Sequence, residues 1–141
     1  MRLAGALLIV LTGGLAGCAT LQHAASRHGV ALTEASWQVL HAVDFSQTVT
    51  IARQPGRYHE DGIPTRWIIG EHPGEGAVEA CWAGLAVLHL AVTRYLAVRA
   101  DRGRPWRWAL YGWEALTLGD SAVAVARNAS IGLQPFGPHR R

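Results

Sequence analysis

Two long apolar stretches, separated by a short loop rich in arginine, constrain the fold of this chain more than any other feature. They cover residues 77–100 and 105–130, and Pro105 falls in the first turn of the second one, where a helix tolerates proline. Drawn as a helix, the first stretch has apolar residues around almost its whole circumference. A helix of that kind is buried in protein or embedded in lipid. The sequence therefore predicts a hairpin of two helices.

A third helix is predicted upstream of this hairpin. Residues 34–53 contain neither Gly nor Pro. Thr33 can cap the helix with its hydroxyl, and the Glu34 carboxylate would face the positive helix end. Residues 54–76 hold three prolines and five glycines, which is typical of a long connection. The expected fold class is all-α, a small three-helix domain in which the second and third helices form the hairpin.

The amino terminus has the layout of a signal peptide. Met1 and Arg2 supply a short basic region, an apolar run follows, and residues 15–18 read Leu-Ala-Gly-Cys. The apolar run spans only about fifteen residues, fewer than the roughly twenty that cross a bilayer as a helix. The tetrapeptide resembles the lipobox of bacterial lipoproteins. That resemblance implies transfer of a diacylglyceryl group to the Cys18 thiol, cleavage before Cys18, acylation of the new amino terminus by chains such as palmitate, and a place in the cell envelope.

The resemblance also gives the expected segments and location. Ala19 follows the cysteine, which in such lipoproteins implies the outer membrane, facing the periplasm; the inner membrane is the alternative. The expected segments are a signal peptide over 1–17, a tether over 18–32, a helical domain over 33–133 and an irregular tail over 134–141.

Charge points to lipid rather than to nucleic acid. The thirteen basic residues are all arginine and face ten acids, so the net charge of +3 is too small to indicate nucleic-acid binding. Guanidinium groups bind phosphates well, so an arginine cluster is a candidate site for lipid headgroups, with a solvated loop as the alternative. The cluster comprises Arg99, Arg102, Arg104 and Arg107.

The residues leave open whether the hairpin crosses a membrane. Its two apolar stretches are long enough, and Trp106 and Trp108 beside the arginine loop resemble interfacial anchors. Ionisable residues within the stretches, such as Arg94 and Asp120, argue against crossing. With Cys18 outside and a first helix that does not span, the arginine loop would face the cytoplasm, as the positive-inside rule requires. If the first helix also spanned, the loop would face the periplasm.

Among the ionisable residues within otherwise apolar helical stretches, four form a candidate buried cluster, namely His41, Asp44, His89 and Glu114. Buried groups of this kind need partners. A bundle can bring Asp44, His89 and Glu114 together in a metal site or a proton relay, or the groups can pair separately and fix the helix register. The sequence favours separate pairing, because it lacks the usual metal-ligand and nucleophile motifs. We therefore expect no catalytic residue, bound metal or cofactor, and no enzymatic activity.

The order of residues in the mature chain resembles a group of small, uncharacterised bacterial envelope proteins. The matching positions are Asp44, Gln47, Thr48, Ile51, Ala52, Pro55, Glu60, Gly70, His72, Pro73, His89, Glu114, Asn128, Ile131 and Gly132. The resemblance implies an envelope location and no particular activity. The expected function is thus a lipid-anchored envelope protein with a structural role, whose partners are membrane lipid and an envelope protein. The alternative is an integral membrane protein that binds an ion or proton in its buried cluster.

Overall fold

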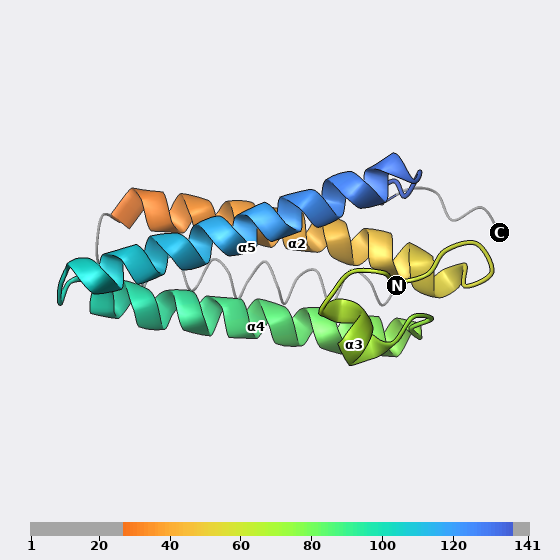
Figure 1. Cartoon of the computed structure of the whole chain (residues 1–141), viewed down its shortest axis with the longest axis horizontal. Coiled ribbons are helices and arrows are strands. Elements are labelled where there is room, and N and C mark those ends of the chain that lie inside the picture. The colour runs from red at the N-terminus through yellow and green to blue at the C-terminus, as the bar shows by residue number, and fades with distance from the viewer. Residues whose placement is uncertain (1–26, 137–141) are drawn as a thin grey trace.

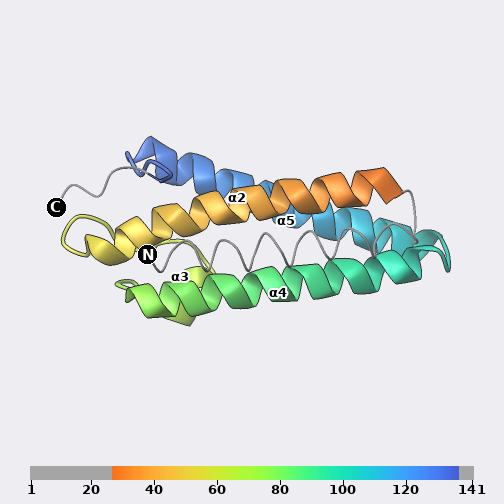
Figure 2. The same ribbon diagram turned by 180° about the vertical axis from the view of Figure 1, so that it is seen from behind.

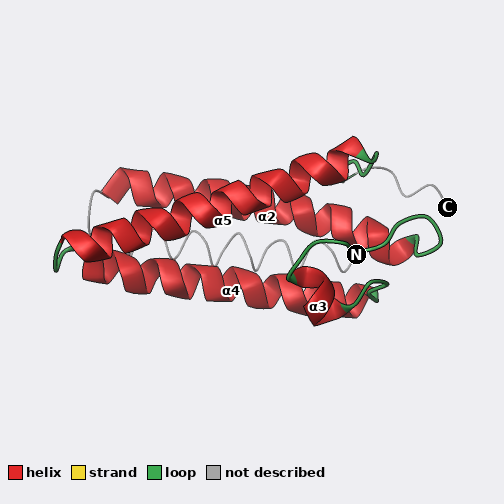
Figure 3. Ribbon diagram, viewed as in Figure 1, coloured by secondary structure: helices red, strands yellow, loops and turns green. Residues whose placement is uncertain are grey.

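The computed structural model describes residues 27–136, and all of the regular secondary structure there is helical, which confirms the all-α class. The elements are α2 (Arg27–Arg53), α3 (Thr65–Ile69), α4 (Glu75–Ala100) and α5 (Arg104–Ser130), as Figures 1 and 3 show. The predictions for the signal peptide, for Cys18 and for the last residues of the tail lie outside the described residues.

The three long helices pack along one another in an elongated bundle (Figures 1 and 2). The helices α4 and α5 form the predicted antiparallel hairpin. The end of the bundle that holds residues 101–103 and the start of α2 is called the turn end below. The opposite end, called the loop end, holds residues 54–74, in which α3 packs against α4.

The helix α2 begins at Arg27, well before the predicted start. Thr33 is therefore not a helix cap; it lies within α2, where its hydroxyl donates to the Gly29 carbonyl at 2.8 Å. Part of the predicted tether is thus helical. The physical reason is packing, because Val30 is buried against Ala97, Ala100 and Leu110 at the turn end and so extends the helix upstream.

Two small apolar clusters mark the two ends of the interior. The cluster around Val30 lies towards the turn end, and the cluster of Val49, Val78 and Trp82 lies towards the loop end. Between these clusters, α2 and α4 carry buried polar side chains, including Glu34, His41, Gln47, His89 and Thr93. The helix α5 buries Glu114 one turn after Leu110. The interior of the bundle is therefore polar at mid-length, where a soluble helical bundle is usually apolar.

Candidate metal centre

Three ionisable side chains, one from each long helix, meet inside the bundle. Glu34 comes from α2, His89 from α4 and Glu114 from α5, and their exposed fractions are 1%, 2% and 5%. One potential ligand atom of each residue lies within 4.8 Å of those of the other two. Imidazole and carboxylate groups at this separation are a donor set for a metal ion.

Helical periodicity explains why these side chains point inward. The buried residues of α4 recur at intervals of three and four positions, and His89 and Thr93 belong to that stripe. On α2, the buried residues Val30, Glu34 and Trp37 follow the same spacing. The packing that buries the apolar members of each stripe therefore also buries the ionisable ones.

Glu34 and His89 form a buried carboxylate–imidazole pair, which is an ion pair when the ring is protonated. The Nδ1 atom of His89 lies 3.0 Å from Oε2 of Glu34. The other carboxylate oxygen, Oε1, accepts a hydrogen bond of 2.7 Å from the Gln38 amide. Oε1 of Glu34 is thus hydrogen-bonded, whereas Oε2 faces Nδ1 of His89 at close range without a hydrogen bond of ordinary geometry.

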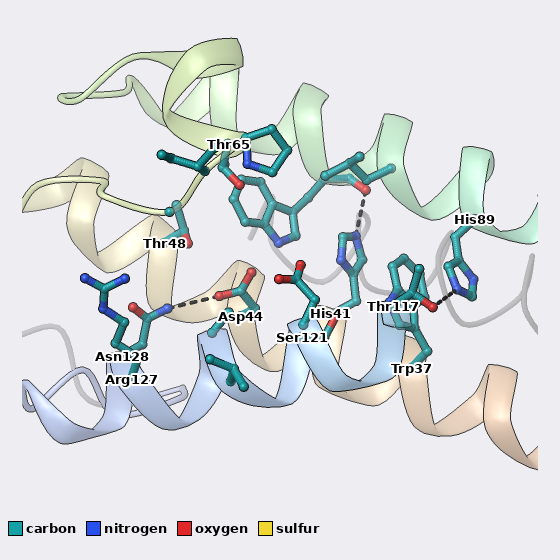
Figure 4. Close-up of a pocket in the computed structure, with 18 of the residues that line it drawn as sticks. Trp37, His41, Asp44, Thr48, Thr65, His89, Thr117, Ser121, Arg127 and Asn128 are labelled. Atoms are coloured by element: carbon teal, nitrogen blue, oxygen red, sulfur yellow. Dashed lines mark hydrogen bonds between the residues drawn. The ribbon is translucent and has the colours of Figure 1, made fainter. Parts of the chain in front are cut away.

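The second nitrogen of His89 is held by Thr117. Nε2 lies 2.9 Å from the Thr117 hydroxyl, as Figure 4 shows. That hydroxyl also lies 2.9 Å from the Trp113 carbonyl, which can only accept, so the hydroxyl hydrogen is used there. The Thr117 oxygen therefore accepts from Nε2–H of His89. In the neutral ring, this tautomer directs the lone pair of Nδ1 towards the carboxylates, an arrangement typical of metal-binding histidines.

Two indoles fix the His89 ring. Trp37 stacks on it with 3.7 Å between ring centroids and only 4° between the planes. Trp113 lies on the ring at 5.2 Å, and its own N–H donates to the Thr93 hydroxyl at 3.0 Å. The imidazole cannot rotate without disturbing this packing, so Nδ1 is preorganised towards Glu34 and Glu114.

Glu114 is the least firmly held member of the group. Within residues 27–136, neither of its buried carboxylate oxygens has a hydrogen bond of ordinary geometry. The Thr93 hydroxyl interacts with this carboxylate electrostatically, but Glu34 brings a second negative charge close to it. A buried carboxylate without hydrogen bonds is costly. The site therefore has unused capacity for a proton or a cation.

The other two predicted cluster residues lie elsewhere. Nε2 of His41 donates to the Trp82 carbonyl at 2.9 Å, and Asp44 accepts from the Asn128 amide at 3.0 Å (Figure 4). The structure thus brings His89 and Glu114 together, as one of the two predicted arrangements requires, but with Glu34 in the place expected for Asp44. The sequence pattern places Glu34 in the first helical turn after Thr33. Its spacing to Trp37 and His41, however, puts all three residues on one face of the helix.

A cavity of about 300 Å³ extends from the loop end towards His89. Its polar lining includes Asp44, Glu60 and Asp120, while Trp37 and Thr117 form part of its wall near His89. Glu60 lies in the connection after α2, and its carboxylate accepts from the Gly62 amide at 2.8 Å. Burial raises the pKa of Glu60, the Gly62 hydrogen bond lowers it, and the Asp61 charge raises it again, leaving a net increase.

The predicted arginine cluster lies at the turn end. Arg99 stacks over the rings of Tyr95 and Trp106, at 4.4 Å and 4.8 Å from their centroids. Arg102, Arg104 and Arg107 are exposed. These contacts fix the position of Arg99, while binding of lipid headgroups stays a prediction.

Comparisons of this chain with protein-family models, with curated proteins and with solved structures find no match. Inference about function therefore starts from the contacts of the described residues.

Proposed function

We propose that this protein binds one divalent transition-metal ion between Glu34, His89 and Glu114. The observation that carries the proposal is the Glu114 carboxylate, which is 5% exposed, lacks a hydrogen bond within the described residues and faces the Glu34–His89 pair. A cation placed among the three groups would neutralise both carboxylates. It would also use the lone pair that the Thr117 contact directs inward.

The donor set narrows the class of ion. One imidazole nitrogen and carboxylate oxygens suit Zn²⁺, Mn²⁺ or Fe²⁺, whereas a soft ion such as Cu⁺ prefers sulfur ligands. Zn²⁺ binds such atoms at about 2.0–2.2 Å, so its ligands lie roughly 3.5 Å apart. The 3.0 Å between Glu34 and His89 is about 0.5 Å shorter, so the two side chains would move slightly apart to hold the ion. Rotation of the otherwise unbound Glu114 side chain would bring in the third ligand.

When metal is absent, protons would take its place. A proton on the Glu34–His89 pair or on Glu114 would relieve the repulsion between the two carboxylates. A metal ion has to displace these protons, so its affinity falls as the pH falls.

The proposal includes the location of the site. We infer that the metal-binding domain is the three-helix bundle of α2, α4 and α5, and that it belongs to the cell envelope. The support is the lipobox resemblance of residues 15–18, which implies an acylated Cys18. A structural, partner-binding role without metal is the second candidate, and the Glu34–His89 pair favours it because that pair is complete on its own.

Metal titration of the full-length protein in mild detergent tests the proposal. After treatment with a chelator, the protein is titrated with Zn²⁺ and with Mn²⁺ in competition with a fluorescent chelator. We expect one ion per chain, and at least a hundredfold weaker binding for Glu114→Gln. The matched control is Glu79→Gln, which removes an exposed carboxylate from α4 and leaves the affinity unchanged.

Two results would contradict metal binding. The wild-type protein would bind neither ion, or Glu114→Gln would bind as tightly as the wild type. Either result would favour the structural role without metal, which makes a prediction of its own. Removing the unpartnered charge of Glu114 would then stabilise the metal-free bundle, and added metal would leave the unfolding midpoint of the wild type unchanged.

A further inference from the structure

We propose that the bundle of α2, α4 and α5 is embedded in a lipid bilayer, with its outward apolar side chains in contact with acyl chains. This inference goes beyond metal binding and does not depend on it. It rests on three observations: polar side chains inside the bundle with apolar ones outside, the lengths of the helices, and the positions of the charged side chains near the helix ends.

The middle of each long helix carries a large aliphatic side chain on its outside. Val39 of α2 is 61% exposed, Val87 of α4 is 69% exposed and Leu116 of α5 is 76% exposed. Within two positions of each one, the same helix buries an ionisable residue, namely His41, His89 or Glu114. Water would favour the opposite arrangement, whereas lipid favours this one.

The helix lengths match a bilayer. The three helices contain 27, 26 and 27 residues, so each is about 40 Å long. That length covers a hydrocarbon core of about 30 Å and part of both headgroup layers. Among the described residues, α4 alone is also apolar enough throughout to be a candidate span, and only 28% of its most apolar window is buried. The core helix of a soluble protein would be mostly buried.

Charged and aromatic side chains gather where headgroups would lie. Residues 99–107 at the turn end carry four arginines and one acid, Asp101, and residues 53–75 at the loop end carry three arginines and four acids. Trp106, Trp108 and Tyr95 lie beside the arginines, in the manner of an interfacial aromatic belt. Arg94, six residues from the end of α4, is exposed and long enough to reach the same level. The excess of arginine at the turn end complements the phosphates of a lipid surface.

Cysteine accessibility in native membranes tests the embedding. In a Cys18→Ala, Cys81→Ala background, which contains no native cysteine, single cysteines replace Val39, Val87 or Leu116 at mid-length, and the exposed Ala77 or Ala129 near helix ends as matched controls. A hydrophilic maleimide is supplied to both sides of the membrane. We expect the cysteines near the helix ends to react at least tenfold faster than those at mid-length, and the mid-length cysteines to react once SDS is added.

Extraction at alkaline pH separates the remaining outcomes. In a Cys18→Ala background, which removes the proposed acyl anchor, the protein should still stay in carbonate-washed membranes. If the mid-length cysteines react as fast as the others, water covers this surface and the proposal is wrong. If they are protected but carbonate releases the protein, another protein surface, such as a second copy of this chain, covers them, which also overturns a lipid contact.

Discussion

The Thr117 hydroxyl lies 2.9 Å from Nε2 of His89 and sets which nitrogen of the imidazole faces Glu34. The two residues come from adjacent helices, α5 and α4, so the chemistry of the candidate metal centre depends on the register of the hairpin. A threonine outside the proposed ligand set therefore controls the orientation of a ligand inside it.

Replacing Thr117 by Val should weaken metal binding without unfolding the bundle. The change removes the acceptor for Nε2–H and leaves the three proposed ligands in place, and loss of such a partner typically lowers metal affinity about 10–100-fold. Competitive titration with Zn²⁺ measures the effect. The control is Thr50→Val. The Thr50 hydroxyl also donates to a carbonyl one turn earlier, but Thr50 lies near the opposite end of α2 from Glu34. Equal affinity in both variants would mean that Thr117 does not orient His89.

Glu34→Gln should destabilise the metal-free protein. The variant breaks a buried ion pair by removing one partner, which typically costs about 3 kcal/mol. The free energy of unfolding is measured by titrating the detergent-solubilised protein with a denaturing detergent in the presence of a chelator. Glu79→Gln on the exposed side of α4 should change it by less than about 0.5 kcal/mol. A loss as small for Glu34→Gln would show that the pair contributes little.

Glu60→Gln should stabilise the protein at neutral pH but not in acid. Because burial raises its pKa, Glu60 holds its proton more tightly in the folded chain than in the unfolded one. The wild type therefore loses stability as the pH rises above about 4, where an unfolded glutamate ionises. Gln removes that loss and keeps an acceptor for the Gly62 amide. Unfolding midpoints at pH 4 and pH 7.5 measure the difference, and a variant less stable than the wild type at pH 7.5 would contradict it.

In a Cys18→Ala background, which lacks the proposed acyl anchor, Leu116→Lys should reduce the amount of protein in carbonate-washed membranes. A lysine at the middle of a lipid-facing helix costs roughly 2.5–3.5 kcal/mol on the insertion scale. In a water-exposed bundle the same change would be neutral, because Leu116 is 76% exposed. Ala129→Lys, near the end of α5, is the control and should insert normally. Immunoblots of the washed membranes quantify both variants, and equal amounts would argue against lipid at Leu116.

The sequence predicted the hairpin closely and the rest of the fold less well. Pro105 and the arginine loop interrupt the chain plainly, so the expected helices over 77–100 and 105–130 agree with α4 and α5 to within two residues. The sequence predicts the start of α2 too late, because residues before Thr33 include Gly29 and have no regular apolar period. The helix is extended there by the packing of Val30, which the sequence pattern does not show. The short α3 lies among prolines and glycines, where the composition predicts only a connection.

The sequence predicts two of the three residues of the candidate site, because the third depends on how the helices pack. His89 and Glu114 stand out as ionisable residues in apolar stretches, which the pattern of one helix is enough to show. Their partner on α2 depends on how far that helix slides along the hairpin. Glu34 and Asp44 are ten positions apart, about 15 Å along the axis, so only one of them can lie level with His89. Tertiary packing decides between them, and the packing of Val30 at the turn end selects Glu34.

The start of α2 at the turn end links the chemistry of the amino terminus to the direction in which the bundle is inserted. Cys18 precedes Arg27 by nine positions, a stretch that reaches at most about 30 Å when fully extended. Bacterial acylation would hold Cys18 on the outer face of the inner membrane, so the turn end of an embedded bundle would lie on that face too. Its arginines would then face the periplasm, although membrane proteins carry most of their arginines on the cytoplasmic side. An arginine turn in the cytoplasm would instead imply that residues before Arg27 stay attached and cross the bilayer once more. The side of the membrane on which Arg102 lies would thus show whether the first seventeen residues are a cleaved signal peptide or a retained part of the mature protein.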